Sequence, residues 1–193
     1  MTAAFTHITT LLSFVFALAL THLLASATDL VLKRDRVRFS WLQALWMANA
    51  MLLLLTNWLS LWDTRGLAHW DIAAIVLQFF FTVLQYFTCS LVSPQVPEDG
   101  VLDMREFHAR QKRWYIGAVA ALGLYAIVIN IFFHARLAGS DPHFLAGQMM
   151  ILPMIVLVML AIFVHRPWLE ALIGLLFMAS LIGTLAFLTP GIG

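Results

Sequence analysis

The sequence has few charged residues and almost no cysteine. Only 11% of its 193 residues are charged, against roughly 25% in a soluble domain, and 62% are hydrophobic. The single cysteine, Cys89, excludes an internal disulfide and any thiolate cluster for a metal or iron–sulfur centre. The net charge of +1 disfavours nucleic-acid binding. These shortages predict an integral membrane protein.

Several functional signals are missing as well. No acidic or basic residue lies at the centre of a long apolar run, which argues against a voltage sensor and an obvious cation-coupled pump. Neither a GxSxG nor an HExxH motif occurs, so serine-nucleophile and zinc-protease chemistry have no sequence support. A catalytic residue is therefore not predicted.

What the sequence does contain is six apolar runs of about 20 residues or more, each long enough to cross a bilayer as a helix. We expect one all-α domain over 1–193, a polytopic membrane helix bundle. Its spans are 7–32, 40–62, 71–93, 114–135, 144–165 and 168–188.

Lys and Arg are unequally divided between the two sides of these spans. Loops one, three and five hold nine of them, at 33, 34, 36, 38, 105, 110, 112, 113 and 166, whereas the opposite side holds only Arg65 and Arg136. Positive residues favour the cytoplasm, so both termini are predicted outside.

The loop 94–113 lies between three spans and three spans. Asp103 followed by Glu106 is typical of a capping pair that starts a helix, which would run into the fourth span. We expect its cationic side chains to lie against anionic lipid headgroups. They are Arg105, Arg110, Lys112 and Arg113.

The third span carries a continuous polar stripe. At about 100° per residue, its polar residues fall within about 80° of one another. They are Asp71, Gln78, Thr82, Gln85, Cys89 and Ser93. Because the other faces are almost entirely apolar, this stripe must face protein or water.

Further polar residues could share a route with the stripe. His22, Ser26 and Asp29 lie on one face of the first span, and Asn130 and His134 are one turn apart in the fourth. They predict a small channel or transporter for an ion or small solute, which a homo-oligomer would help to enclose.

Two other interpretations remain open. The polar residues could hydrogen-bond between helices, and Asp29 could pair with Lys33, which would make the chain a membrane-embedded interaction or sensor subunit. A metal- or haem-binding enzyme ranks third. Its weak metal candidates are His7, His69, His134 and His143, which lack a tight ligand spacing, and the axial haem pair His22 and His134 would lie at different depths. The cofactor is left undetermined.

Two features of the last spans are expected to be structural. Glu170 lies in the first turn of the sixth span, where a carboxylate favours the positive helix end. Pro153 lies within the fifth span and is expected to kink it.

Three segments carry a family resemblance: KRDRVR (33–38), SWLQALWMANAMLLLLTNWLSLW (40–62) and PEDGVLDMREFHARQKRW (97–114). In these segments the chain resembles bacterial six-span membrane proteins of unknown function. The resemblance implies a multi-pass protein of the bacterial inner (plasma) membrane and implies no activity.

Overall fold

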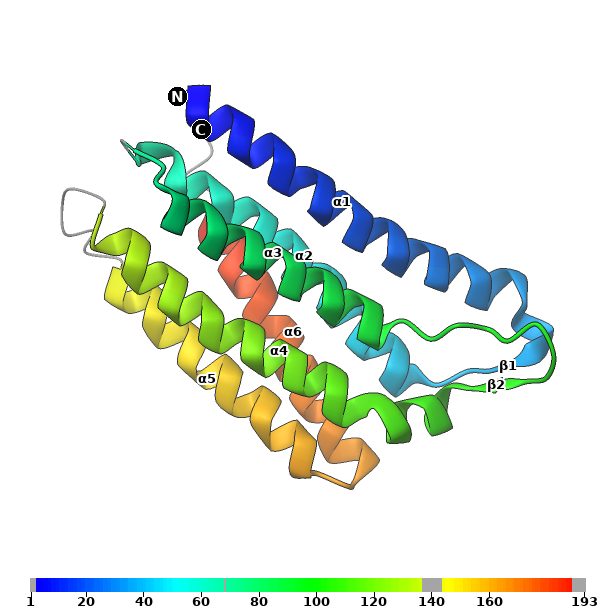
Figure 1. Cartoon of the computed structure of the whole chain (residues 1–193). Coiled ribbons are helices and arrows are strands. Elements are labelled where there is room, and N and C mark those ends of the chain that lie inside the picture. Colours follow the sequence, from blue (N-terminus) through cyan, green and yellow to red (C-terminus); the bar gives the residue numbers. More distant parts are fainter. Residues whose placement is uncertain (1–2, 68, 137–143, 189–193) are drawn as a thin grey trace.

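Six α-helices dominate the part of the chain that the computed structural model describes, residues 3–67, 69–136 and 144–188 (Figure 1). They are α1 (Ala3–Leu32), α2 (Trp41–Ser60), α3 (Ile72–Val92), α4 (Met104–His134), α5 (Phe144–Phe163) and α6 (Pro167–Leu188). The connections contain two short 3₁₀ helices, η1 (Arg34–Arg36) and η2 (Leu61–Gly66), and two strands, β1 (Val37–Arg38) and β2 (Leu102–Asp103). The all-α fold is confirmed, and each predicted apolar run corresponds to one helix.

Side-chain caps fix where two of the helices begin. The Asp103 Oδ1 atom accepts hydrogen bonds from the backbone N–H groups of Arg105 (2.9 Å) and Glu106 (3.3 Å), so α4 starts well before its apolar run. The Asp71 Oδ1 atom accepts from the Ala74 N–H at 2.8 Å and caps α3. Both carboxylates satisfy N–H groups that a helix start leaves without partners. The predicted helix start at Asp103 is confirmed.

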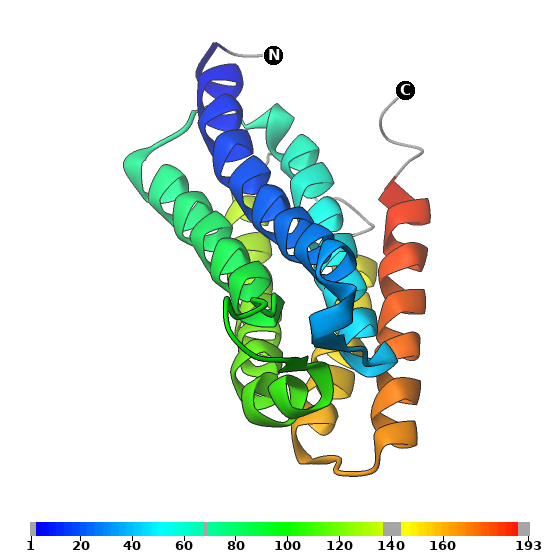
Figure 2. The same cartoon turned by 90° about the vertical axis from the view of Figure 1, so that its right-hand side faces the viewer.

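α2 is the central helix of the bundle. It contacts α1, α3, α4 and α6, while α3, α4, α5 and α6 pack against one another in succession. α1 lies along α3 at one edge, which Figure 2 shows from the side. Residues on the inner face of α2 can therefore bond to several helices at once.

The polarity of the bundle is inverted relative to a water-soluble protein. Large apolar side chains such as Phe14, Phe80 and Phe163 are exposed on its outside, whereas amides such as Gln43 and Gln85 are completely buried. Five helices are long and apolar enough to cross a membrane: α1, α2, α3, α4 and α6. The apolar stretch described in α5, Ile151–Phe163, is shorter, and Pro153 lies inside that helix. These features define a membrane-type helix bundle.

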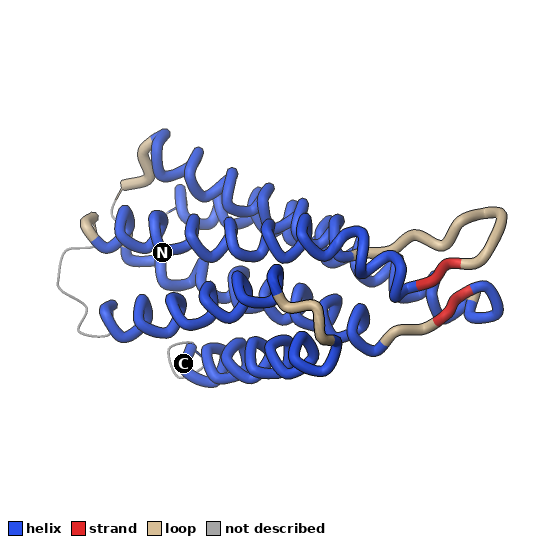
Figure 3. The backbone as a smooth tube through the Cα atoms, turned by 90° about the horizontal axis from the view of Figure 1, so that it is seen from below, coloured by secondary structure: helices blue, strands red, loops and turns tan. Residues whose placement is uncertain are grey.

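The two longest basic segments meet at one end of the bundle, which we call the basic end. There β1 and β2 pair in parallel, with Val37 opposite Leu102 and Arg38 opposite Asp103 (Figure 3). The Arg36 guanidinium donates to the Glu98 carbonyl, and the Ser26 hydroxyl donates to the Pro94 carbonyl at 2.6 Å. The connection before α4 is therefore attached both to the end of α1 and to the segment that follows it.

Candidate functional site

The predicted polar stripe of α3 forms part of a helix seam. Gln78, Thr82 and Gln85 are all buried on one face of α3, as are Cys89 and Ser93. The Gln85 Oε1 atom accepts from Asn57 Nδ2 of α2 at 2.6 Å, and its Nε2 group lies 3.4 Å from the Cys89 sulfur. The amide of Gln85 is thus used between helices, as the alternative interpretation of the stripe expected.

The predicted polar face of α1 is divided among separate neighbours. Asp29 forms a 2.9 Å ion pair with Lys33, which was the other interpretation of that carboxylate. Ser26 bonds to the Pro94 carbonyl, and the His22 ring lies 6.2 Å from the ring of Tyr86. None of the hydrogen bonds in the described chain joins these three residues to Gln78 or Gln85.

The predicted residues at the opposite end also have separate environments. The Asp71 Oδ2 atom forms a 2.9 Å ion pair with Arg136, while Asn130 and His134 are half-buried. His7 and His69 are exposed, and His143 lies outside the described residues. Among the described residues no group of three potential ligands could hold a metal ion.

The predicted set of headgroup residues needs one correction. Arg105, Arg110 and Arg113 are exposed, but Lys112 is buried. The Lys112 ammonium donates to the Val164 carbonyl at 2.6 Å and lies 3.3 Å from the Glu170 carboxylate. Lys112 points into the bundle because these two groups from the α5–α6 connection and α6 can bond an ammonium there.

Lys112 belongs to a buried cluster that the sequence analysis missed, formed by Gln43, His108, Lys112, Tyr115 and Glu170. We call it the charge cluster. His108, Lys112 and Tyr115 follow one another at i, i+4 and i+7, so they share one face of α4. Gln43 comes from the first turn of α2 and Glu170 from the first turn of α6. That helical spacing was the one signal in the sequence that could have shown the charged residues turning inward.

Short contacts hold the cluster together. His108 Nε2 lies 2.6 Å from Glu170 Oε1, and His108 Nδ1 lies 2.6 Å from the Tyr115 hydroxyl and 3.2 Å from Gln43 Oε1. The exposed fractions are only 6% for His108, 9% for Lys112 and 3% for Glu170. Charges this far from water are costly unless they are paired, and here each carboxylate oxygen has a nitrogen partner.

The contacts determine how the cluster can carry a proton. Gln43 Nε2 donates to the Val92 carbonyl at 2.6 Å, which fixes Gln43 Oε1 as an acceptor facing His108. If neutral His108 donates from Nε2 to Glu170, Nδ1 accepts from the Tyr115 hydroxyl, and Gln43 Oε1 then faces a second acceptor. A doubly protonated His108 instead donates from Nδ1 to the Tyr115 hydroxyl oxygen. The hydroxyl hydrogen of Tyr115 is then free to donate to Gln43 Oε1, which lies 3.5 Å from the hydroxyl oxygen. Between the two protonation states the hydrogen bond between His108 Nδ1 and the Tyr115 hydroxyl therefore reverses its direction, and Gln43 Oε1 gains a donor.

The charge cluster is separated from the seam at Gln85. On the same face of α2, between Gln43 and Asn57, lie the buried apolar side chains of Trp46, Ala50 and Leu54. The Trp46 ring lies 6.0 Å from that of Tyr115 and 6.2 Å from that of Phe177. A continuous polar route along α2 is interrupted at this level.

Together, the helix bundle and the buried ionic groups define a class: an α-helical membrane-type protein with a buried cluster of ionisable side chains near one end. Comparison with protein-family models, with curated proteins and with solved structures found no match for the chain.

Proposed function

We propose that the chain crosses a membrane six times with both termini outside. The five long apolar helices support this, as does the apolar stretch of α5. The excess of Lys and Arg in loops one, three and five supports placing the basic end in the cytoplasm. We propose the inner membrane of a bacterium as its location, in line with the expectation from the sequence.

Within that arrangement, we propose a proton-responsive sensor or interaction subunit. The observation that carries this proposal is the buried 2.6 Å contact between His108 and Glu170. Ionisable residues inside a membrane bundle are costly, and function commonly accounts for them. The histidine ring can also hold one proton or two, so it can change the charge of such a cluster.

The immediate effect of a proton on this cluster is a change in its charge. The titratable groups that face His108 are Glu170 of α6 and Tyr115 of α4, and Lys112 bonds to the other oxygen of Glu170. With Glu170 and Lys112 ionised, the cluster is neutral when His108 is neutral and carries +1 when His108 is protonated. The Gln43 Oε1 atom then gains a hydrogen bond, while Gln43 Nε2 still donates to the Val92 carbonyl at the last turn of α3. The ends of α2, α3, α4 and α6 that meet at the cluster therefore respond to one proton.

A pH series of hydrogen–deuterium exchange on the full chain in lipid nanodiscs tests this function. We expect protection in segments 92–112 and 164–173 to change along the pH series, and the change to be lost in His108→Gln. His22→Gln is the matched control, because His22 is half-buried in α1 and lies outside the cluster. A pH response that is absent from the wild type, or that persists in His108→Gln, would contradict the proposal.

Channel or transporter activity is the competing function. The packed amide of Gln85 and the apolar side chains between Gln43 and Asn57 favour the sensor over the transporter. Solute leak from proteoliposomes separates the two, because a transporter with the predicted route should respond to Gln78→Leu, Gln85→Leu and Asp29→Asn. Cys89 provides a second assay, since a dry seam predicts that a small thiol reagent does not label it in the folded protein.

A further inference from the structure

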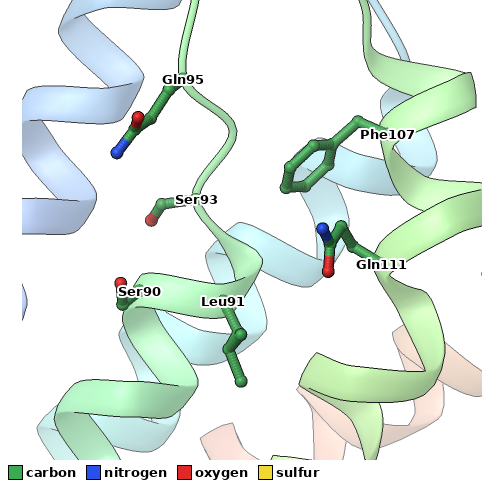
Figure 4. A pocket seen from close by; sticks show the side chains of 6 residues that line it. All are labelled: Ser90, Leu91, Ser93, Gln95, Phe107 and Gln111. Atoms are coloured by element: carbon green, nitrogen blue, oxygen red, sulfur yellow. The ribbon is translucent and has the colours of Figure 1, made fainter.

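A cleft separates the end of α3 and the connection after it from the first turns of α4. It consists of two adjoining hollows of about 300 and 360 Å³, which share Gln95, Phe107 and Gln111. Figure 4 shows Phe107 and Gln111 projecting from α4 on one side, with Ser90, Ser93 and Gln95 on the other. The second hollow extends along α4 past Asp103, Glu106 and Arg110. The space is within the size range of small-molecule sites.

The depth of the cleft can be estimated from the exposed tryptophans of the basic end. Trp114 is 70% exposed, and Trp41 and Trp168 are exposed as well, a placement typical of a membrane–water boundary. At about 1.5 Å per residue, Gln111 lies roughly 4.5 Å and Phe107 roughly 10 Å beyond Trp114 along α4. The headgroup layer is roughly 5 to 7 Å thick on each side of the hydrocarbon. The end of the cleft at Arg110 and Gln111 therefore lies at the level of lipid headgroups, and Glu106, about 12 Å beyond Trp114, lies on the aqueous side of that level.

The charges along the cleft favour a zwitterion over an anion. Glu106 provides a carboxylate and Arg110 a guanidinium, while the carboxylate of Asp103 lies 3.7 Å from the guanidinium of Arg38 and so adds no net charge. Hydrogen bonds from the backbone N–H groups of Glu106 and Arg105, in that order, lower the pKa of Asp103, so this carboxylate is ionised at neutral pH. The 3.2 Å pair between Glu106 and Arg110 uses only one carboxylate oxygen and one guanidinium nitrogen. A ligand can therefore bind both members of that pair.

The neutral groups of the cleft are available for a ligand too. The side chains of Gln95 and Gln111 make no hydrogen bond within the described chain. Their amides can donate to phosphate or ester oxygens, and the half-buried ring of Phe107 lines both hollows.

We propose that the cleft binds the headgroup of a phosphoethanolamine phospholipid. The ammonium group lies against Glu106, and the phosphate is bound by Arg110 and Gln111. A primary ammonium donates three hydrogen bonds, whereas the trimethylated ammonium of a choline lipid donates none, so the Glu106 carboxylate distinguishes the two. The proposal depends on the membrane placement and is independent of proton binding at His108, so either can fail without the other.

Lipid competition tests this site. The purified full chain is exchanged in mild detergent with an equimolar mixture of phosphatidylethanolamine, phosphatidylcholine and phosphatidylglycerol of identical acyl chains, and the bound lipid is measured by native mass spectrometry. We expect phosphatidylethanolamine to be enriched by about tenfold, the effect of one charge-assisted hydrogen bond. Glu106→Gln should abolish this preference, and Arg110→Gln should weaken the binding of both zwitterionic lipids.

Matched controls keep the result interpretable. Arg105→Gln changes the charge of α4 as Arg110→Gln does, yet Arg105 is exposed and does not line the cleft, so binding should be unchanged. Glu106 is exposed, and a melting curve verifies that its variant folds. Enrichment of phosphatidylglycerol, equal binding of all three lipids, or an unaltered preference in Glu106→Gln would overturn the proposal. So would binding of water-soluble glycerophosphoethanolamine as tight as that of the lipid, because a free headgroup compound would then be the ligand.

Discussion

Removing one charge from the pair Lys112–Glu170 should destabilise the fold strongly. The ammonium and carboxylate are 3.3 Å apart, and both side chains are almost completely buried. At an effective dielectric constant of about 20, their attraction is about 5 kcal/mol, part of which offsets the loss of hydration. Lys112→Met leaves Glu170 with His108 as its remaining partner, and Glu170→Gln leaves the Lys112 ammonium with the Val164 carbonyl but without a counter-charge. We expect each variant to cost about 3 to 5 kcal/mol.

A double-mutant cycle isolates the pair itself. The double variant Lys112→Met/Glu170→Gln contains neither charge, so it should be more stable than the sum of the two single losses implies, by about 2 to 3 kcal/mol. Equilibrium unfolding of the full chain in mixed micelles, with SDS as denaturant and circular dichroism as the signal, measures all four proteins.

The ion pair Asp29–Lys33 is the matched control. Its atoms are 2.9 Å apart, closer than in the buried pair, but the side chains are 47% and 37% exposed. Exposed pairs one helical turn apart contribute only about 0.3 to 0.5 kcal/mol. If the cycle at Lys112 and Glu170 gave a coupling no larger than that of the control cycle, the assignment of a buried ion pair would be refuted.

Two further predictions concern helix packing and helix capping. Gly123→Ala should lower thermal stability, because the new Cβ would lie 2.8 Å from Ile155 Cγ1, an overpacking cost of about 1 to 3 kcal/mol against a gain of about 1 kcal/mol in helix propensity. Gly117→Ala meets no atom within 4 Å and should raise the melting temperature instead. Asp103→Ala should destabilise the start of α4, whereas Asp103→Asn should retain the cap. Because the pKa of Asp103 is lowered in the folded protein, its contribution is complete above the unfolded pKa of the carboxyl and is lost as pH falls through the folded value. Acid unfolding curves of the two variants and the wild type check this sign.

The positions of the helices were predictable because they follow from residues that are close together in the sequence. Apolar runs of sufficient length located all six, and Asp103 predicted the true start of α4 from its spacing to Glu106. The polar face of α3 was also predictable, since helical geometry alone places Gln78 and Gln85 together. Local periodicity was enough for these features.

The charge cluster was not predictable in the same way. Its members are far apart in sequence, and Glu170 does occupy the first turn of α6, as expected, while its carboxylate pairs with residues of α4. Lys112 lies in a strongly basic segment, where solvent or headgroup contact is the usual expectation for each cation. Only the approach of α6 to α4 identifies which of these cations is buried. The parallel pairing of β1 with β2 is likewise a long-range contact that no local pattern in 33–38 or 97–103 indicated.

The central position of α2 has a consequence for how the chain is made. Helices emerge from the ribosome in order, yet Gln43 requires His108, and the Asn49 amide donates to the Gly174 carbonyl at 3.0 Å. These side chains of α2 therefore lack their hydrogen-bond partners in the bilayer until nearly the whole polypeptide has been synthesised. A nascent chain arrested before Pro167 would carry His108 and Lys112 without their carboxylate. Such an incomplete product should be recognised and degraded by membrane quality control.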